Sequence, residues 1–300
     1  MGLEIKPTGQ SVGAVVNGLD LSKELSVETF KVLVQALGEH GYLSFPHQSL
    51  GPAELKRFSG MFGGLQTSVS GTYNDPVHPE VMTLSNMKKN GVPLGLSDAG
   101  QDWHTDMSYN RMIGFANVLH ALHVPKRNGV PLGDTGFANM HFAYEGLPEE
   151  LKSDLAGMTV THDFNKFWSK MVTSGSGRAP LTAEQKAKRP PSVHPIFMEH
   201  PITGRKVLYA NPGYAIRINE LPEVESDRIL AFLFEHQLKD DYTTFYHWAE
   251  GDVLIWDNIG TLHKAVADYG PDEARMMIRC QVMADQVFEP GFPGKISASA

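Results

Sequence analysis

Trp103-His104-Thr105-Asp106 places an imidazole and a carboxylate two positions apart in the chain. On a β-strand, residues i and i+2 point to the same side, so His104 and Asp106 can reach one ion. A third ligand must come from a distant strand folded alongside, and His263 is the candidate. Two imidazoles and one carboxylate hold a non-haem Fe(II) on one face and leave the opposite positions open. The sequence therefore predicts an open iron site.

Taken alone, a His-x-Asp match is a weak signal, because the chain has 13 histidines and 34 acidic residues. His78-Pro79-Glu80 has the equivalent His-x-Glu form. Proline cannot donate a hydrogen bond within a sheet, so His78 is better interpreted as a loop residue. His104 and Asp106 could equally form a local ion pair on a half-exposed strand, and the downstream sequence has to decide.

Two arginines, Arg275 and Arg279, fall on one face of a predicted strand beyond His263. The opposite face is apolar apart from a thiol and consists of Met276, Ile278, Cys280 and Val282. Like charges repel, so each arginine is expected to meet an anion, which a guanidinium binds through two parallel hydrogen bonds. The alternative is two surface arginines paired with acidic side chains.

Composition limits the classes of partner. A chain of 300 residues with 41% hydrophobic content can bury a sizeable core. The net charge of −8 and the absence of a Lys/Arg-rich run argue against nucleic acid. An acidic protein that binds small anions needs locally placed positive charge, which strengthens the argument from the arginines.

The compartment is predicted to be the cytoplasm. The single cysteine, Cys280, excludes an intrachain disulfide and suits a reducing environment. No apolar run reaches the length of a membrane span, and the N-terminus has no signal-peptide core.

Many short strands with Gly/Pro turns predict a mostly β sandwich or jelly roll with helices outside one sheet. We expect one domain over residues 1–300 with a flexible tail at 290–300. Helices are predicted over 27–39, 52–62, 141–156 and 222–238. Strands are predicted within 3–20 and over 41–45, 81–85, 103–109, 115–124, 134–140, 158–163, 193–200, 206–211, 244–248, 253–257, 261–265 and 276–286.

Residues 164–191 differ from the rest in composition, being rich in Lys and Arg beside a Gly-Ser-Gly stretch. The segment is long for an ordinary connection, and such segments commonly act as lids. We predict a mobile lid over the iron site, with a solvated insertion as the alternative.

The order and spacing of several segments resemble the taurine dioxygenase and 2,4-dichlorophenoxyacetate dioxygenase family of Fe(II)/2-oxoglutarate enzymes, from about Ile5 to Asp285. The matching segments are Trp103 to Asp106, Gly133-Asp134-Thr135, His200 to Gly204, Leu208 to Tyr214 with Arg217-Ile218, Trp256-Asp257-Asn258, His263 and the arginine pair. The resemblance implies a cupin-like jelly roll, the double-stranded β-helix, and a homo-oligomer. It also implies Fe(II), 2-oxoglutarate as co-substrate, O2, and hydroxylation of a C–H bond.

By the same resemblance His104, Asp106 and His263 are the iron ligands. Thr135 and Arg275 look like the pair that holds the distal carboxylate of 2-oxoglutarate. Arg279 looks like the residue that meets a small anionic substrate: a sulfonate, a phenoxyalkanoate or an alkyl sulfate. Four side chains are expected to shape the substrate pocket: Tyr73, Met107, Tyr109 and Tyr214.

Two departures from the family pattern matter. The loop between His263 and Arg275 is one residue longer than in the taurine enzyme, so the roles of Arg275 and Arg279 could be exchanged. Gly100 stands where the taurine enzyme has an asparagine near the substrate amine, which argues against taurine itself. Two other classes stay open: a Zn-dependent hydrolase with the same ligands, and a non-catalytic module that binds small anions.

Overall fold

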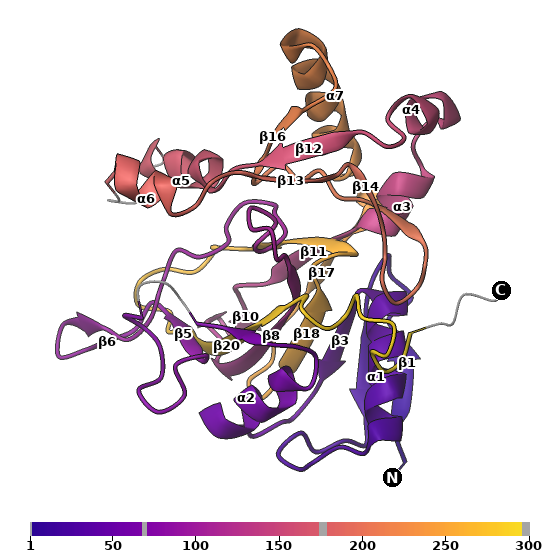
Figure 1. The fold of residues 1–300 in the computed structure, drawn as a ribbon. Coiled ribbons are helices and arrows are strands. Elements are labelled where there is room, and N and C mark those ends of the chain that lie inside the picture. Colours follow the sequence, from indigo (N-terminus) through magenta and orange to yellow (C-terminus); the bar gives the residue numbers. More distant parts are fainter. Residues whose placement is uncertain (1, 68–70, 174–178, 296–300) are drawn as a thin grey trace.

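An eight-stranded sheet forms the base of the molecule in the computed structural model, which describes residues 2–67, 71–173 and 179–295 (Figure 1). Its strands follow the order β1-β2-β3-β18-β8-β20-β4, with β5 also paired to β20. Their bounds are β1 Glu4–Pro7, β2 Ala14–Asn17, β3 Tyr42–Phe45, β18 Val253–Asp257, β8 Gly114–His123, β20 Met276–Met283, β4 Leu65–Gln66 and β5 Met82–Ser85.

A second, three-stranded sheet faces the first. It consists of β17 (Thr243–Tyr246), β11 (Thr135–Asn139) and β19 (Thr261–Ala265), all antiparallel. The Phe137 ring of this sheet lies 4.9 Å from Tyr42 and 5.7 Å from Trp256 in the large sheet. Buried aromatic contacts of this kind hold two sheets face to face.

A third layer covers one end of these sheets, above β11 and β17 in Figure 1. It contains the sheet β13-β12-β16 and the hairpin β14-β15. The bounds of its elements are β12 Thr159–His162, β13 Ser192–Pro195, β14 Phe197–Glu199, β15 Lys206–Leu208, β16 Ala215–Ile218, α3 Met140–Glu145, α4 Glu149–Asp154, α5 Phe164–Thr173, α6 Ala183–Ala187 and α7 Glu223–His236. Two-residue strands form the surface hairpins β6 Lys88–Lys89 with β7 Val92–Pro93, and β9 Lys126–Arg127 with β10 Val130–Pro131.

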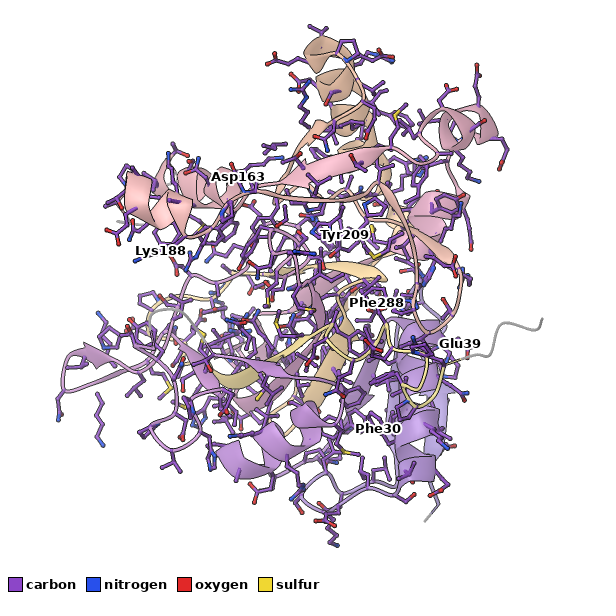
Figure 2. All side chains as sticks on the ribbon, in the orientation of Figure 1. Phe30, Glu39, Asp163, Lys188, Tyr209 and Phe288 are labelled. Carbon is purple, nitrogen blue, oxygen red and sulfur yellow. The ribbon has the colours of Figure 1, made fainter. Side chains whose placement is uncertain are left out.

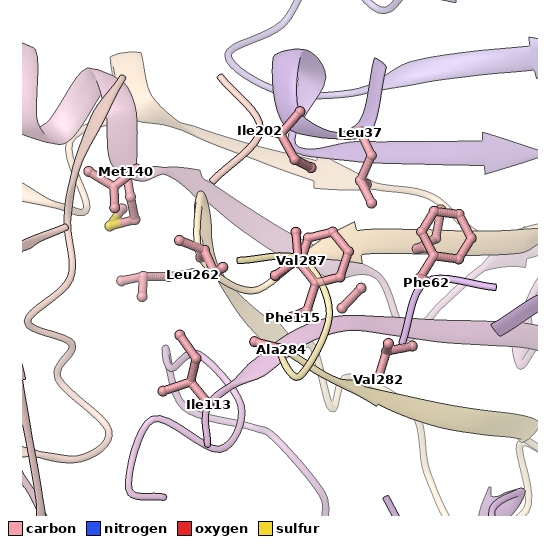
Figure 3. Packing of buried hydrophobic residues seen from close by; sticks show 14 of the residues in the cluster. Leu37, Phe62, Ile113, Phe115, Met140, Ile202, Leu262, Val282, Ala284 and Val287 are labelled. Carbon is pink, nitrogen blue, oxygen red and sulfur yellow. The ribbon is translucent and has the colours of Figure 1, made fainter. Parts of the chain in front are cut away.

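The N-terminal helices α1 (Val27–His40) and α2 (Pro52–Gly60) cover the large sheet from the other side. The Ser26 hydroxyl caps α1 by accepting a hydrogen bond from the Thr29 backbone N–H, and α2 has proline in its first turn. The buried side of α1 joins the main core, in which side chains from distant elements meet (Figure 3).

Most predicted elements are confirmed, and three are wrong. The helix predicted over 141–156 is two helices, since Gly146 ends α3 and Pro148, which lacks an N–H, cannot continue it. The strand predicted over 193–200 is two strands, because the chain changes its partner at Ile196: β13 pairs with β12, and β14 pairs with β15. Of the strand predicted over 103–109, only His104 pairs.

The predicted tail does not begin at residue 290. Phe292 is buried and packs edge-on against Phe30 and Phe115, with ring centroids 6.2 Å apart in both cases. The last residues of the predicted tail, 296–300, lie outside the described residues. Among the residues that are described, no helix combines the length and apolar character that a membrane crossing requires.

We expect Phe62→Ala to lower the free energy of unfolding by about 3–5 kcal/mol, because it empties a site that no water reaches. The Phe62 side chain is fully buried and packs on Phe30 and Phe58. Val32→Ala, at an exposed position on α1, is the control and should change stability by less than about 0.5 kcal/mol. Chemical denaturation measures both, and equal losses would contradict this account of the core.

Candidate active site

A short backbone bridge brings the three predicted metal ligands together. The His104 N–H donates to the His263 carbonyl (3.0 Å), and the His263 N–H donates back (2.8 Å). Their rings lie 4.3 Å apart. The Asp106 carboxylate completes the group, with Oδ1 3.4 Å from His104 Nε2 and Oδ2 3.8 Å from His263 Nε2. All three residues offer a ligand atom within 4.8 Å of the others.

The chain turns directly after the bridge, and this turn aims Asp106 at the imidazoles. Met107 has a φ of 62°, in the left-handed region, which ends the extended run that the sequence predicted. Gly100 also has a positive φ, and a Cβ there would lie 3.2 Å from His104 Cε1. The rival pair at 78–80 is elsewhere, since Glu80 forms an ion pair with Lys56.

Hydrogen bonds orient two of the ligands. His104 Nδ1 lies 2.7 Å from the Asp102 carbonyl, which can only accept, so Nδ1 carries the proton and Nε2 keeps its lone pair. Asp106 Oδ2 accepts from the side-chain amides of Asn117 (3.0 Å) and Gln281 (2.9 Å). These amides fix the carboxylate rotamer without neutralising its charge.

The ionisation of the site suits a cation. Burial alone would raise the pKa of Asp106, but hydrogen bonding and charge from His104, with Arg279 and His263, hold that pKa well below its usual range. Burial, reinforced by His104, keeps the pKa of His263 well below normal. An ionised carboxylate and a neutral imidazole are the forms that bind a metal, so these residues fit Fe(II).

The Trp256-Asp257-Asn258 segment has two separate structural roles. The Asn258 side-chain carbonyl accepts from the Trp256 indole N–H (3.1 Å) and from Asn117 (3.0 Å), and Asn117 in turn holds Asp106. The segment thereby reaches Asp106, a predicted metal ligand, through the side-chain amide of Asn117. No local sequence pattern points to Asn117, whereas Gln281 shares a strand face with Arg279, which could have indicated its role.

Asp257 points the other way, into a fully buried pair with His200. His200 Nδ1 accepts from the backbone N–H groups of Ile202 and Thr203, so Nε2 carries the proton and donates to Asp257 (2.7 Å). The carboxylate also caps the turn at Gly260. This pair ties the His200–Gly204 turn to the end of β18, which accounts for two of the matching segments without a catalytic role.

Arg275 is buried, and its backbone is clamped from both sides. Its N–H donates to the Asn86 side chain (2.9 Å), and its carbonyl accepts from Ser85 (2.7 Å). Its guanidinium lies over the Tyr269 ring and against Gly133, where a Cβ would stand 3.2 Å from Nε. Among the described residues, Nε has no hydrogen-bond partner. A buried arginine with a free Nε–H donor is prepared for an anion.

Thr135 is the first residue of β11, two residues after Gly133, against which Arg275 packs. Its hydroxyl oxygen accepts from the Trp248 indole N–H (3.0 Å), so the O–H is free to donate to a ligand oxygen. Arg279 sits closer to the metal ligands, with Nη1 3.7 Å from Asp106 Oδ2 and Nη2 3.7 Å from Met82 Sδ. The two arginines therefore serve different parts of the site.

An aromatic wall, formed by Tyr109, Phe164, Phe167 and Tyr214, stands over His104. Phe167 stacks on the imidazole at 6.3 Å and Tyr214 approaches it edge-on at 6.2 Å. Tyr109 contacts both Tyr214 and Phe164 at 4.8 Å. Two rings of this wall belong to α5, the first helix of the predicted lid.

Of the two remaining predicted pocket residues, Met107 is buried at the turn after Asp106. Tyr73 is only partly buried, and its carbonyl accepts from Thr83 on β5, the strand next to β20. Its place in the pocket stays a prediction.

The sequence matches the profile of the taurine catabolism dioxygenase TauD, TfdA family over residues 4–281. The chain belongs to this family. It is 30% identical to pentalenolactone F synthase of Streptomyces avermitilis, over 95% of both chains. It is 29% identical to an alkylsulfatase of Acinetobacter baylyi, covering 92% of this chain and 84% of that one.

Solved structures agree. A taurine dioxygenase from Burkholderia xenovorans superposes with a TM-score of 0.77 at 26% identity, covering 95% of this chain and 90% of that one. AAD-2 in complex with Mn(II) and N-oxalylglycine superposes with a TM-score of 0.75 at 25% identity, covering 94% and 98%. The protein is an Fe(II)/2-oxoglutarate-dependent dioxygenase that uses O2, and neither a zinc hydrolase nor a non-catalytic module.

Removing one amide donor should weaken metal binding. We expect Gln281→Leu to reduce Fe(II) affinity roughly tenfold, because Asp106 loses a partner that orients it. Gln66→Leu, on the adjacent strand with its amide bonded to Thr67, is the matched control. Anaerobic calorimetric titration of the metal-free proteins measures both affinities, and an unchanged value for Gln281→Leu would show that the amide plays no part.

Proposed function

We propose that His104, Asp106 and His263 hold the Fe(II) of this dioxygenase. The observation that carries the proposal is the convergence of their three ligand atoms in a buried site. Bound iron supplies the redox chemistry by which O2 converts 2-oxoglutarate to succinate and CO2 and oxidises a substrate C–H bond to C–OH. The protein keeps the carboxylate ionised, orients the imidazoles and excludes water.

The assignment of the arginines follows from their surroundings. We propose that Arg275, with the Thr135 hydroxyl, binds the distal carboxylate of 2-oxoglutarate, because both flank Gly133 and offer free donors. Arg279 then meets the anionic group of the substrate, since it is the arginine beside Asp106. The longer loop before Arg275 does not argue for exchanging the two roles. Hydrogen bonds to Asn86 and Ser85 hold the backbone of Arg275 in place.

The substrate is proposed to be a small organic anion with an apolar body. Arg279 recognises the charge, and the aromatic wall offers apolar surface to a hydrocarbon body. The relatives named above include an alkylsulfatase, and another, 26% identical over 96% of this chain, is a 2,4-dichlorophenoxyacetate dioxygenase of Cupriavidus pinatubonensis. A sulfonate, phenoxyalkanoate or alkyl sulfate that carries no amine fits this chain.

Residues 164–191 are proposed to act as a lid. Helix α5 places Phe167 over His104, and it is tied down by Lys170 to Asp102 (2.7 Å) and by Lys166 to the Ala215 carbonyl (2.7 Å). The Lys170 pair is largely exposed, so it contributes at most about 1 kcal/mol and permits opening. Residues 174–178 of this segment lie outside the described residues.

We further infer that the two facing sheets form the double-stranded β-helix expected of the sequence, because the metal ligands and both arginines lie between them. A single domain, a cytoplasmic location and a homo-oligomer stay predictions.

The decisive test is succinate formation with Fe(II), 2-oxoglutarate and a panel of alkanesulfonates, phenoxyalkanoates and alkyl sulfates. Asp106→Ala, His104→Ala and His263→Ala should each abolish it, since each removes a ligand. Asp241→Ala, at an exposed position, should retain it. Undiminished turnover in the Asp106 variant would refute the proposed iron site.

The proposed roles of the two arginines predict that substituting each one raises a different KM. Arg275→Gln should raise the KM for 2-oxoglutarate, and Arg279→Gln the KM for the substrate. Asn86→Ala should raise the KM for 2-oxoglutarate about fivefold, because one lost hydrogen bond of about 1 kcal/mol loosens the clamp on Arg275. Asn17→Ala on the surface serves as control. If the two arginine effects exchange, the proposed order is reversed.

A further inference from the structure

A cavity of about 320 Å³ opens between α5 and α6 at the outer end of the aromatic wall. Phe164, Leu181 and Pro191 give it apolar walls, and Lys186 and Arg189 give it positive charge. Asp163, one of its lining residues, is labelled in Figure 2 beside α5 in the third layer. The mechanism described above does not use this cavity.

Among the described residues, Arg189 has no acidic side chain as an ion-pair partner. Its guanidinium carbon lies 4.5 Å from the centre of the Phe164 ring, which holds it by a cation–π contact. The neighbouring basic residues are engaged, since Lys170 pairs with Asp102 and Lys188 with Glu184. Within the part of the chain that the structure describes, no carboxylate lies within 4.0 Å of Arg189. A half-buried guanidinium without a carboxylate is free to bind one.

One acidic side chain, Asp163, also lines the cavity, but it is already engaged. Its Oδ1 accepts a hydrogen bond from the Asn165 backbone N–H (2.8 Å), at the first turn of α5. A carboxylate in this position stabilises a helix N-terminus. Among the described residues, Asp163 forms no ion pair with Arg189, because its carboxylate is turned to the start of α5.

The rings of the aromatic wall connect the cavity to the metal ligands. Phe164 contacts Tyr109, Tyr109 contacts Tyr214, and Tyr214 approaches His104. Tyr109 lies within the electrostatic reach of both arginines. Burial, and then Asp106, raise its pKa to about 12, while Arg189 and Arg279 each oppose that rise. An apolar path thus has one arginine at each end.

We propose that this cavity is a second anion-binding subsite, in which Arg189, with Lys186 at the rim, receives the far anionic group of an elongated organic dianion. The near anionic group meets Arg279, and a hydrocarbon spacer lies along the aromatic wall. The ligand class is a dicarboxylate, disulfonate or sulfate–carboxylate with an apolar middle. The inference rests on the proposed function, because it extends the same substrate site outward.

The test compares matched monoanions and dianions. 1-Alkanesulfonates and α,ω-alkanedisulfonates of two to ten carbons are titrated anaerobically into the Fe(II)/2-oxoglutarate enzyme by calorimetry, and succinate release is measured separately in air. One range of spacer lengths should bind about tenfold more tightly as the dianion than as the monoanion, as expected for one added charge-assisted hydrogen-bonded pair.

Variants locate the effect. Arg189→Gln should remove the advantage of the dianion and leave binding of the monoanion within about twofold, whereas Arg189→Lys should keep part of it. Lys188→Gln makes the same charge change at the next residue, outside the cavity lining, and should alter neither ligand.

The proposal is overturned if no spacer length favours the dianion, or if Arg189→Gln and Lys188→Gln weaken both ligands equally, which would show only a general loss of charge. These results are distinct from a failure of the proposed function. That failure would appear as no succinate release above the substrate-free rate with any compound, and the binding comparison would still decide on the subsite.

Discussion

The pair of backbone hydrogen bonds between His104 and His263 is the constraint on which the site depends. It joins a loop to β19 across more than half of the sequence and sets two imidazoles side by side. A metal-binding carboxylate then needs only a short turn to reach them. Because the bridge is made of backbone atoms, the side chains are left free for ligands. Loss of this register would turn the histidines away from each other.

Around the bridge, buried polar groups give two of the three predicted ligands, His104 and Asp106, an outer hydrogen-bond partner. The carbonyl of Asp102 selects the tautomer of His104, and the amides of Asn117 and Gln281 hold Asp106. Burying such partners costs desolvation energy, which their hydrogen bonds to the carboxylate and the imidazole offset. The network spans β8, β18 and β20 of the large sheet, so the ligand geometry is as rigid as the sheet itself.

Three arginines supply local positive charge in an otherwise acidic protein. The innermost is Arg275, whose backbone is held by Ser85 and Asn86. Arg279 lies beside Asp106. The outermost is Arg189, at the cavity beside Phe164. A net negative field disfavours anions in general. Under the proposed two-ended site, ligands with correctly spaced anionic groups are selected over those that merely carry charge, and the aromatic wall between the arginines favours an apolar body.

The sequence by itself determined the ligand types, the alternating faces of β20 and most elements, because these depend on local spacing and periodicity. It also indicated the family, through the order of short segments. It placed His104 and Asp106 on one strand, but the structure brings Asp106 in by a turn at Met107. Only the tertiary structure decided the contacts of Asn117, Asn86 and Arg189, and that Asp257 and His200 form a buried pair. Those contacts join residues far apart in the chain, and no local pattern encodes which distant partner a polar side chain will meet.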